Sequence, residues 1–132
     1  EHWDYVVLQE MSHGPCTSPG SFFASVERLC AQIRTAGAVP VLYATWAYQK
    51  GGGKLTAKGW DYDEMVHKLH DAYHKAAQKN HALVADAGQR FYELSAAQDL
   101  YAGDGVHPNE LGSRIAAETI AAVIHAHKEK QL

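Results

Sequence analysis

The feature that most constrains this chain is an alternation of short apolar runs with long stretches of helical periodicity. The apolar runs cover residues 5–8, 39–45 and 82–87. Within each run the apolar residues follow one another without polar alternation, which is typical of strands buried on both faces. Strands that alternate with helices form parallel sheets covered by helices, so the sequence predicts an α/β fold.

Three long segments carry apolar residues at helical spacing, which predicts amphipathic helices that cover the sheet. These segments are residues 21–36, 61–78 and 110–127, and a shorter helix is expected over residues 89–97. Gly37 is well placed to end the first helix, and Asn109 to cap the last one. The polar, glycine-rich residues 50–59 are expected to form a mobile surface loop.

Three strands are few for a parallel sheet that has to bury a layer of helices on each face. The first strand would also leave an apolar edge, because residues 5–8 read Tyr-Val-Val-Leu. We therefore expect at least one further strand, either N-terminal to residue 1 or from another chain. Residues 1–132 would then be a single, partial domain.

Composition excludes several classes of function. The net charge of −3 and the isoelectric point near 6.3 give no basic footprint for nucleic acid. No apolar stretch approaches the roughly 20 residues that span a bilayer. The two cysteines are too few for a disulfide framework. Cys30 lies on an apolar helix face and is expected to be a buried free thiol, although a single bridge to Cys16 stays open.

Polar and aromatic residues follow each predicted strand. In open α/β sheets, ligands bind outside the carboxyl ends of the strands, so these residues are expected to converge on one rim and line a pocket. The candidates after the first strand are Gln9, Glu10 and Ser12. Those after the second are Trp46 and Tyr48, and those after the third, beyond a short helix, are Asp104 and His107.

Asp104 and His107 lie three residues apart in the stretch LYAGDGVHPNELG, between glycines and directly before the last helical pattern. A histidine can act as general base and then as general acid when a carboxylate fixes its tautomer. The spacing allows a direct hydrogen bond within one turn. The alternative is an Asx-type turn that leads into the helix, with His107 merely exposed.

The segment DGVHPNELGSRIAAETI resembles the last conserved block of the SGNH/GDSL-type esterases and lipases, in which D-x-x-H-P precedes a helix. WDYVVLQEMSHGP resembles the strand and loop of the family's third block, and the likeness spans about residues 3–126. It implies a three-layer α/β/α, flavodoxin-like fold with a parallel sheet. It also implies that Asp104 and His107 are the acid and base of a Ser–His–Asp triad, and that Gln9 helps to hold the oxyanion.

The chain departs from that family pattern at the nucleophile. Neither the G-D-S-type serine block nor the second oxyanion donor, a glycine, is present, so we expect the nucleophilic serine upstream of residue 1. Ser12 is a poor substitute, because its neighbour His13 cannot readily face it. Ser12 is expected instead to be a loop residue or to contact substrate. The 132 residues alone are expected to be inactive or nearly so.

The remaining polar and aromatic candidates have two interpretations each. Trp46 or Tyr48 could offer a flat wall to an acyl group or a sugar ring, or could belong to the core. Glu10 could face substrate, or could cap its loop or pair with a surface cation. His67, His70 and His74 are expected to form a solvated helix face, because no HExxH motif is present and Asp71 lies off that face. His125 and His127 are expected to complement the dipole at the end of the last helix.

The leading hypothesis is therefore a serine ester hydrolase, of esterase or acetylesterase type, that acts on an acyl or carbohydrate ester. It would need no cofactor and no metal. The resemblance also favours a secreted or periplasmic location. The alternative is a non-catalytic ligand-binding or assembly module on the same fold. A metal-dependent site that combines Asp104 and His107 with another histidine is a third possibility.

Overall fold

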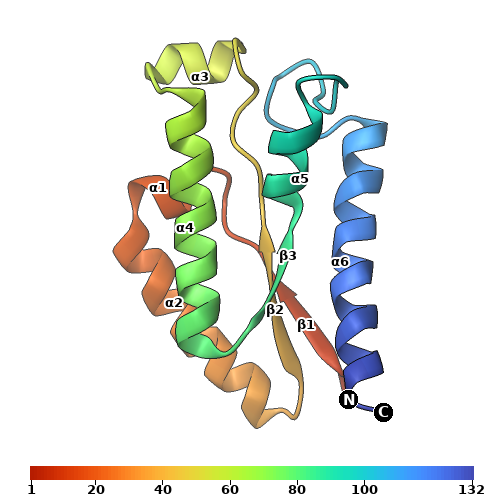
Figure 1. Ribbon diagram of the computed structural model, residues 1–132. Coiled ribbons are helices and arrows are strands. Elements are labelled where there is room, and N and C mark those ends of the chain that lie inside the picture. The colour runs from red at the N-terminus through yellow and green to blue at the C-terminus, as the bar shows by residue number, and fades with distance from the viewer.

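Three parallel strands form the centre of the computed structural model, which describes residues 1–132 (Figure 1). The strands are β1 (Tyr5–Leu8), β2 (Val39–Ala44) and β3 (Leu83–Asp86), in the spatial order β1-β2-β3. Val7 lies opposite Val41 and Leu42 lies opposite Val84, and both strand pairs are parallel. The strands predicted from the apolar runs are therefore all present, and each is trimmed by no more than a residue at either end.

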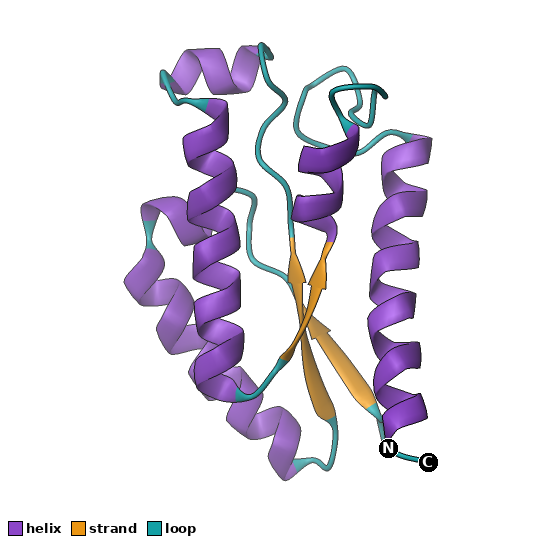
Figure 2. Ribbon diagram, viewed as in Figure 1, coloured by secondary structure: helices purple, strands orange, loops and turns teal.

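Helices cover the sheet on two sides (Figure 2). They are α1 (Gly14–Thr17), α2 (Pro19–Thr35), α3 (Gly53–Lys58), α4 (Tyr62–Asn80), α5 (Ala87–Leu94) and α6 (Glu110–Lys130). In Figure 1, α2 and α4 lie on the left of the strands and α6 lies on the right, while α5 continues upward from the end of β3 on the side toward α6. This arrangement confirms the predicted three-layer α/β/α architecture. No helix combines the length and the apolar character that crossing a membrane requires.

The larger hydrophobic core lies between the sheet and the layer of α2 and α4. Leu42 of β2 is in this core with Phe22 and Cys30 of α2 and Leu69 and Tyr73 of α4, all of them nearly inaccessible to water. Burial of side chains of this size contributes about 1.5–3 kcal/mol each. The cysteine expectation is confirmed, because Cys30 is buried and both thiols are free.

A second, smaller core lies under α5 and α6. It consists of Phe91, Leu100, Tyr101 and Ile115, with Trp46 and other residues packed against it. Leu100 and Tyr101 belong to the segment that leads into the Asp104–His107 turn. This core therefore anchors the start of the candidate catalytic loop.

The first strand is less buried than the sequence indicated. β1 pairs only with β2, and the side chain of Val7 is 40% exposed. The prediction of burial on both faces is wrong here, because the helices pack mainly on β2 and β3 and leave β1 partly uncovered. The Tyr5 hydroxyl and Nδ1 of His127, 2.7 Å apart, tie β1 to the last turns of α6. His127 thus has a specific partner, beyond the dipole interaction that was expected.

The glycine-rich segment after β2 is more ordered than predicted. Residues 53–58 form α3 instead of a loop, and Leu55 is only 5% exposed. Gly59 ends this helix with a φ of 67°, a conformation that glycine adopts without a steric penalty. Leu55, the one buried residue of α3, supplies the tertiary contact that outweighs the poor helix propensity of the preceding glycines.

Side-chain caps fix where two of the long segments begin. Asp61 accepts a hydrogen bond from the Glu64 backbone N–H at the start of α4, and Asn109 accepts one from Gly112 at the start of α6. The cap predicted at Asn109 is thereby confirmed. Each cap satisfies a backbone donor that the helix itself leaves without a partner.

Gly112 provides a test of how closely α6 packs on the candidate loop. A Cβ at this position would lie 2.3 Å from the Leu100 carbonyl oxygen. We expect Gly112→Ala to lower the free energy of unfolding by about 1–3 kcal/mol in urea denaturation, because the backbone has to shift. Gly20→Ala is the control, because nothing lies within 4 Å of its added Cβ. Equal stability of the two variants would contradict this packing.

Candidate functional site

Three chain segments meet beyond the carboxyl ends of the strands, as the sequence predicted. The Ser12 hydroxyl lies 3.1 Å from the Tyr48 hydroxyl, which joins the segment after β1 to the segment after β2. The Gln49 backbone N–H donates to the Gly105 carbonyl at 2.9 Å, which joins the segment after β2 to the Asp104–His107 loop. The three segments therefore meet along one rim.

Asp104 and His107 form a hydrogen-bonded pair on that rim. His107 Nδ1 lies 2.5 Å from Asp104 Oδ2, and the His107 side chain is 77% exposed. The second carboxylate oxygen, Oδ1, accepts the backbone N–H groups of Val106 and His107, each at 2.9 Å. The loop thus contains the Asx-type turn that was the alternative interpretation, and it also makes the side-chain contact that a catalytic pair requires. The ring nitrogen Nε2 makes no hydrogen bond within the protein.

These contacts determine the charge state of Asp104. The hydrogen bond from His107 is the largest cause, and the two backbone N–H groups add to it; together they lower the pKa of the Asp104 carboxyl to about 2. Asp104 is therefore ionised at neutral pH. A carboxylate that accepts from Nδ1 favours the imidazole tautomer in which Nε2 can accept a proton.

Three hydrogen bonds hold the loop against the segment that follows β2. The Trp46 indole N–H donates to the Val106 carbonyl at 2.9 Å, and the Gln49 backbone N–H donates to that of Gly105. The Tyr101 hydroxyl donates to the Ala47 carbonyl at 2.7 Å, in a buried position. We refer to these three bonds as the rim clamp. They fix the backbone on both sides of Asp104.

Contacts within the loop close it on itself. The Ala102 N–H donates to the His107 carbonyl at 2.8 Å, and the Asn109 N–H donates to that of Leu100 at 2.9 Å. Gly105 has a φ of 68°, which side-chain-bearing residues rarely adopt. The loop therefore reverses direction between Asp104 and His107, and this reversal brings the two side chains together.

Of the two aromatic candidates, Tyr48 is buried and Trp46 is half-buried. The Trp46 ring stacks on Phe91 with centroids 4.1 Å apart, and its N–H is used in the rim clamp. Tyr48 is only 2% exposed, and its ring stacks against Trp60. The structure thus places both residues among packing contacts close to the rim, and a role for either in contacting substrate stays a prediction.

The candidates after β1 differ in their surroundings. Gln9 is exposed and has no hydrogen-bond partner within the protein. Glu10 folds back on its own loop, where Oε1 accepts the Met11 N–H at 2.6 Å, and its backbone N–H points to the Tyr73 hydroxyl at 3.4 Å. Ser12 is half-buried and hydrogen-bonded to Tyr48. The oxyanion role of Gln9 and the substrate contacts of Glu10 and Ser12 stay predictions.

Sequence reasoning missed the residues that position the loop. Tyr101 and Gln49 contribute to the rim clamp, and Asp99 accepts the Tyr101 N–H at 3.2 Å. Their only signal in the sequence was their position next to candidate residues. A cleft of about 540 Å³ borders these same residues and is lined in part by Tyr62 and Tyr92. Neither Asp104 nor His107 lines it.

Comparison with known proteins finds solved structures that are similar to this chain. No family model matches the chain, and no curated protein matches it significantly. A protein from Slackia heliotrinireducens, described as a "putative SGNH hydrolase", superposes with a TM-score of 0.89 at 46% identity, over 94% of this chain. A DUF4886 family protein from Bacteroides uniformis gives a TM-score of 0.76 at 26% identity, over 95% of this chain.

A more distant structure shares the fold. An alpha/beta hydrolase enzyme from the metagenome of Lake Arreo, Spain, has a TM-score of 0.68 at 17% identity, over 91% of this chain. The chain spans 67%, 52% and 59% of the lengths of these three proteins.

The Asp104–His107 contact predicts an unusual titration of the carboxyl group. In NMR titrations, we expect Asp104 to lose its charge only as the pH falls through about 2. Any contribution of this carboxylate to loop stability is then present above the ordinary pKa of about 3.9 and is lost as the pH falls through the lower value.

His107→Ala removes the largest cause of this shift, so the pKa of Asp104 should rise but should stay below its ordinary value, because the backbone N–H groups remain. His67→Ala, a change at an exposed site on α4, is the control and should leave the titration of Asp104 unchanged. An ordinary pKa for Asp104 in the unmodified protein would contradict the geometry.

Proposed function

The chain belongs to the SGNH hydrolase family, and from that premise we propose that it carries the acid and base of a serine ester hydrolase. The substrate would be an acyl or carbohydrate ester, of the kind that esterases and acetylesterases cleave. The observation that carries the proposal is the contact between Asp104 Oδ2 and His107 Nδ1, on a loop that leaves Nε2 without a partner and His107 exposed.

In the proposed reaction, a serine hydroxyl attacks the ester carbonyl carbon while His107 Nε2 takes the hydroxyl proton. Asp104 stays ionised and stabilises the imidazolium that forms. The amide N–H of Gln9 donates to the oxyanion of the tetrahedral intermediate. His107 then returns the proton to the leaving alcohol. In the second half-reaction His107 takes a proton from a water molecule, whose oxygen attacks the acyl carbon. His107 then returns that proton to the serine oxygen as the bond to serine breaks and the carboxylic acid leaves.

We propose that this serine lies upstream of Glu1. Within the chain, Ser12 is the only serine in the rim segments after β1 and β2, and its hydroxyl contacts Tyr48. The unpaired side of β1 and the exposed Val7 offer a place where a preceding strand could pair. In the pattern of the family, the serine block precedes the block that β1 resembles, and this order supports a serine upstream of Glu1.

The test is fluorophosphonate labelling of a polypeptide that includes the residues encoded upstream of Glu1. We expect one serine upstream of Glu1 to be labelled, and turnover of a p-nitrophenyl ester to fall by about 10⁴- to 10⁶-fold in His107→Ala. His67→Ala, which alters an exposed histidine of α4, should retain full activity. The 132-residue chain alone should show neither labelling nor turnover.

Two outcomes would contradict this proposal. Turnover by the 132-residue chain that Ser12→Ala abolishes would make Ser12 the nucleophile. A longer polypeptide that is folded yet neither labelled nor active would favour the non-catalytic module instead.

A further inference from the structure

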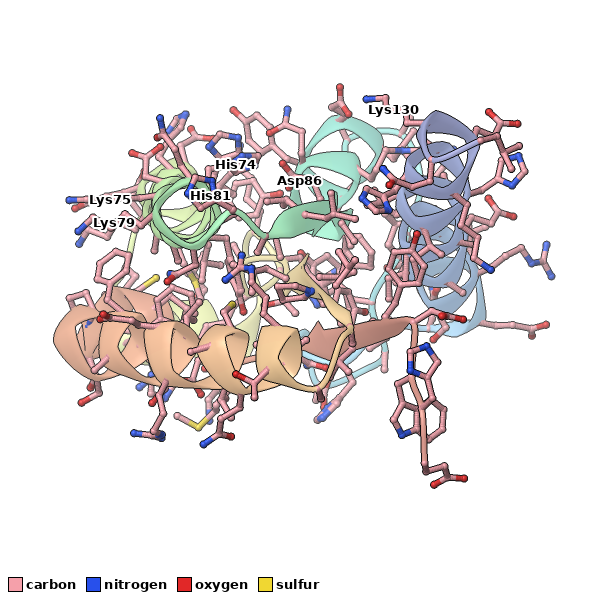
Figure 3. All side chains as sticks on the ribbon, turned by 90° about the horizontal axis from the view of Figure 1, so that it is seen from below. His74, Lys75, Lys79, His81, Asp86 and Lys130 are labelled. Atoms are coloured by element: carbon pink, nitrogen blue, oxygen red, sulfur yellow. The ribbon has the colours of Figure 1, made fainter.

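A second cluster of titratable side chains lies on a different pair of elements. His70 and His74 project from α4, one helical turn apart, toward Asp86 at the end of β3. Their potential ligand atoms, one from each residue, all lie within 4.8 Å of one another. Figure 3 shows His74 on α4 and Asp86 at the start of the neighbouring α5. The catalytic proposal makes no use of this cluster.

The distances in the cluster are close to those of a metal site. His74 Nε2 lies 2.5 Å from Asp86 Oδ2, and His70 Nε2 lies 3.7 Å from the same oxygen. In tetrahedral coordination with bonds near 2.0–2.1 Å, ligand atoms are about 3.3 Å apart. The observed separations fall on both sides of that value, so side-chain shifts of about 1 Å would admit an ion.

The surroundings hold each ligand in place. Asp86 Oδ1 accepts the Gln89 backbone N–H at 3.2 Å, which fixes the carboxylate and leaves Oδ2 facing the histidines. His70 Nδ1 lies 3.5 Å from Asp71 Oδ1, so a carboxylate is near its outer ring nitrogen, an arrangement that often orients metal-bound histidines. The two imidazoles stack, with centroids 4.1 Å apart.

The side chains of the cluster are partly accessible to solvent, as the binding of an ion requires. The side chains of His70, His74 and Asp86 are 40%, 41% and 26% exposed. An ion can therefore enter from solvent, and a water molecule can occupy the remaining position. The expectation of a plain solvated histidine face is thus wrong in one respect: a carboxylate faces His70 and His74, and it comes from β3 instead of from Asp71.

We propose that His70, His74 and Asp86 bind one divalent transition-metal ion, with Zn²⁺ as the preferred ion. Two imidazoles and one carboxylate with an open fourth position form a donor set that zinc accepts. The ion would join α4 to the junction of β3 and α5, because Asp86 also caps α5. Its role would be to stabilise that junction, independently of ester hydrolysis.

The test is calorimetric titration of ZnCl₂ into the untagged, EDTA-dialysed polypeptide that includes the residues encoded upstream of Glu1. We expect one ion per chain, and we expect Zn²⁺ to raise the melting temperature. His74→Ala and Asp86→Asn should each weaken binding by at least about 10-fold. Asp86→Asn retains an oxygen that can cap α5, so it tests the ligand without removing the cap. His67→Ala, on the same helix but outside the cluster, is the matched control and should bind normally.

Co²⁺ supplies an independent readout, because tetrahedral sites give it strong visible absorption bands that the two ligand variants should lose. Far-UV circular dichroism identifies any variant that fails to fold. If His74→Ala fails to fold, the zinc affinity of Asp86→Asn decides whether the proposal holds. The proposal is overturned if the unmodified protein does not bind zinc. It is also overturned if zinc binds the ligand variants and the unmodified protein equally, or if His67→Ala weakens binding as much as His74→Ala does.

Discussion

The candidate site depends on the rim clamp, the three hydrogen bonds that join the last loop to the segment after β2. Trp46 and Gln49 donate to the carbonyls of Val106 and Gly105, and Tyr101 donates to that of Ala47. Isolated loops of this length have many conformations, and fixing each residue costs about 1–2 kcal/mol of entropy. The clamp and the small core beneath it offset that cost, so the loop has one shape before any ligand arrives.

That fixed shape accounts for the chemistry of the Asp104–His107 pair. The reversal at Gly105 brings Asp104 Oδ2 to His107 Nδ1, and the backbone N–H groups of Val106 and His107 occupy the other carboxylate oxygen. The carboxylate is thereby held in the ionised state, and the imidazole is oriented with Nε2 directed away from it. A site preorganised in this way needs little rearrangement to accept a proton.

Much of this could be predicted from the sequence, and the exceptions have physical causes. The strands and long helices follow from hydrophobic periodicity, and the Asp–His pair follows from its spacing in one turn. The exposure of β1 could not be read from residues 5–8, because an apolar run does not show whether helices cover both of its faces. The contributions of Tyr101 and Gln49 depend on contacts between distant segments, and α3 depends on the burial of Leu55.

The histidine cluster likewise depends on a contact between segments that are distant in the sequence. The one-turn spacing of His70 and His74 is visible in the sequence, but their carboxylate partner, Asp86, comes from a strand that lies beside α4 only after folding. Carboxylates close to the histidines in the sequence, such as Asp71, therefore do not reveal that Asp86 is the partner. Sites built from one segment are predictable from spacing, whereas sites built from several require the fold.

The central claim is that Asp104 holds His107 in the tautomer that can act as a base, and ¹⁵N NMR of the imidazole ring measures this directly. At a pH where the ring is neutral, His107 should carry its proton on Nδ1 and have a bare Nε2, and Asp104→Asn should change that tautomer balance. A His107 ring protonated mainly on Nε2, or one whose tautomers do not respond to Asp104→Asn, would contradict the claim.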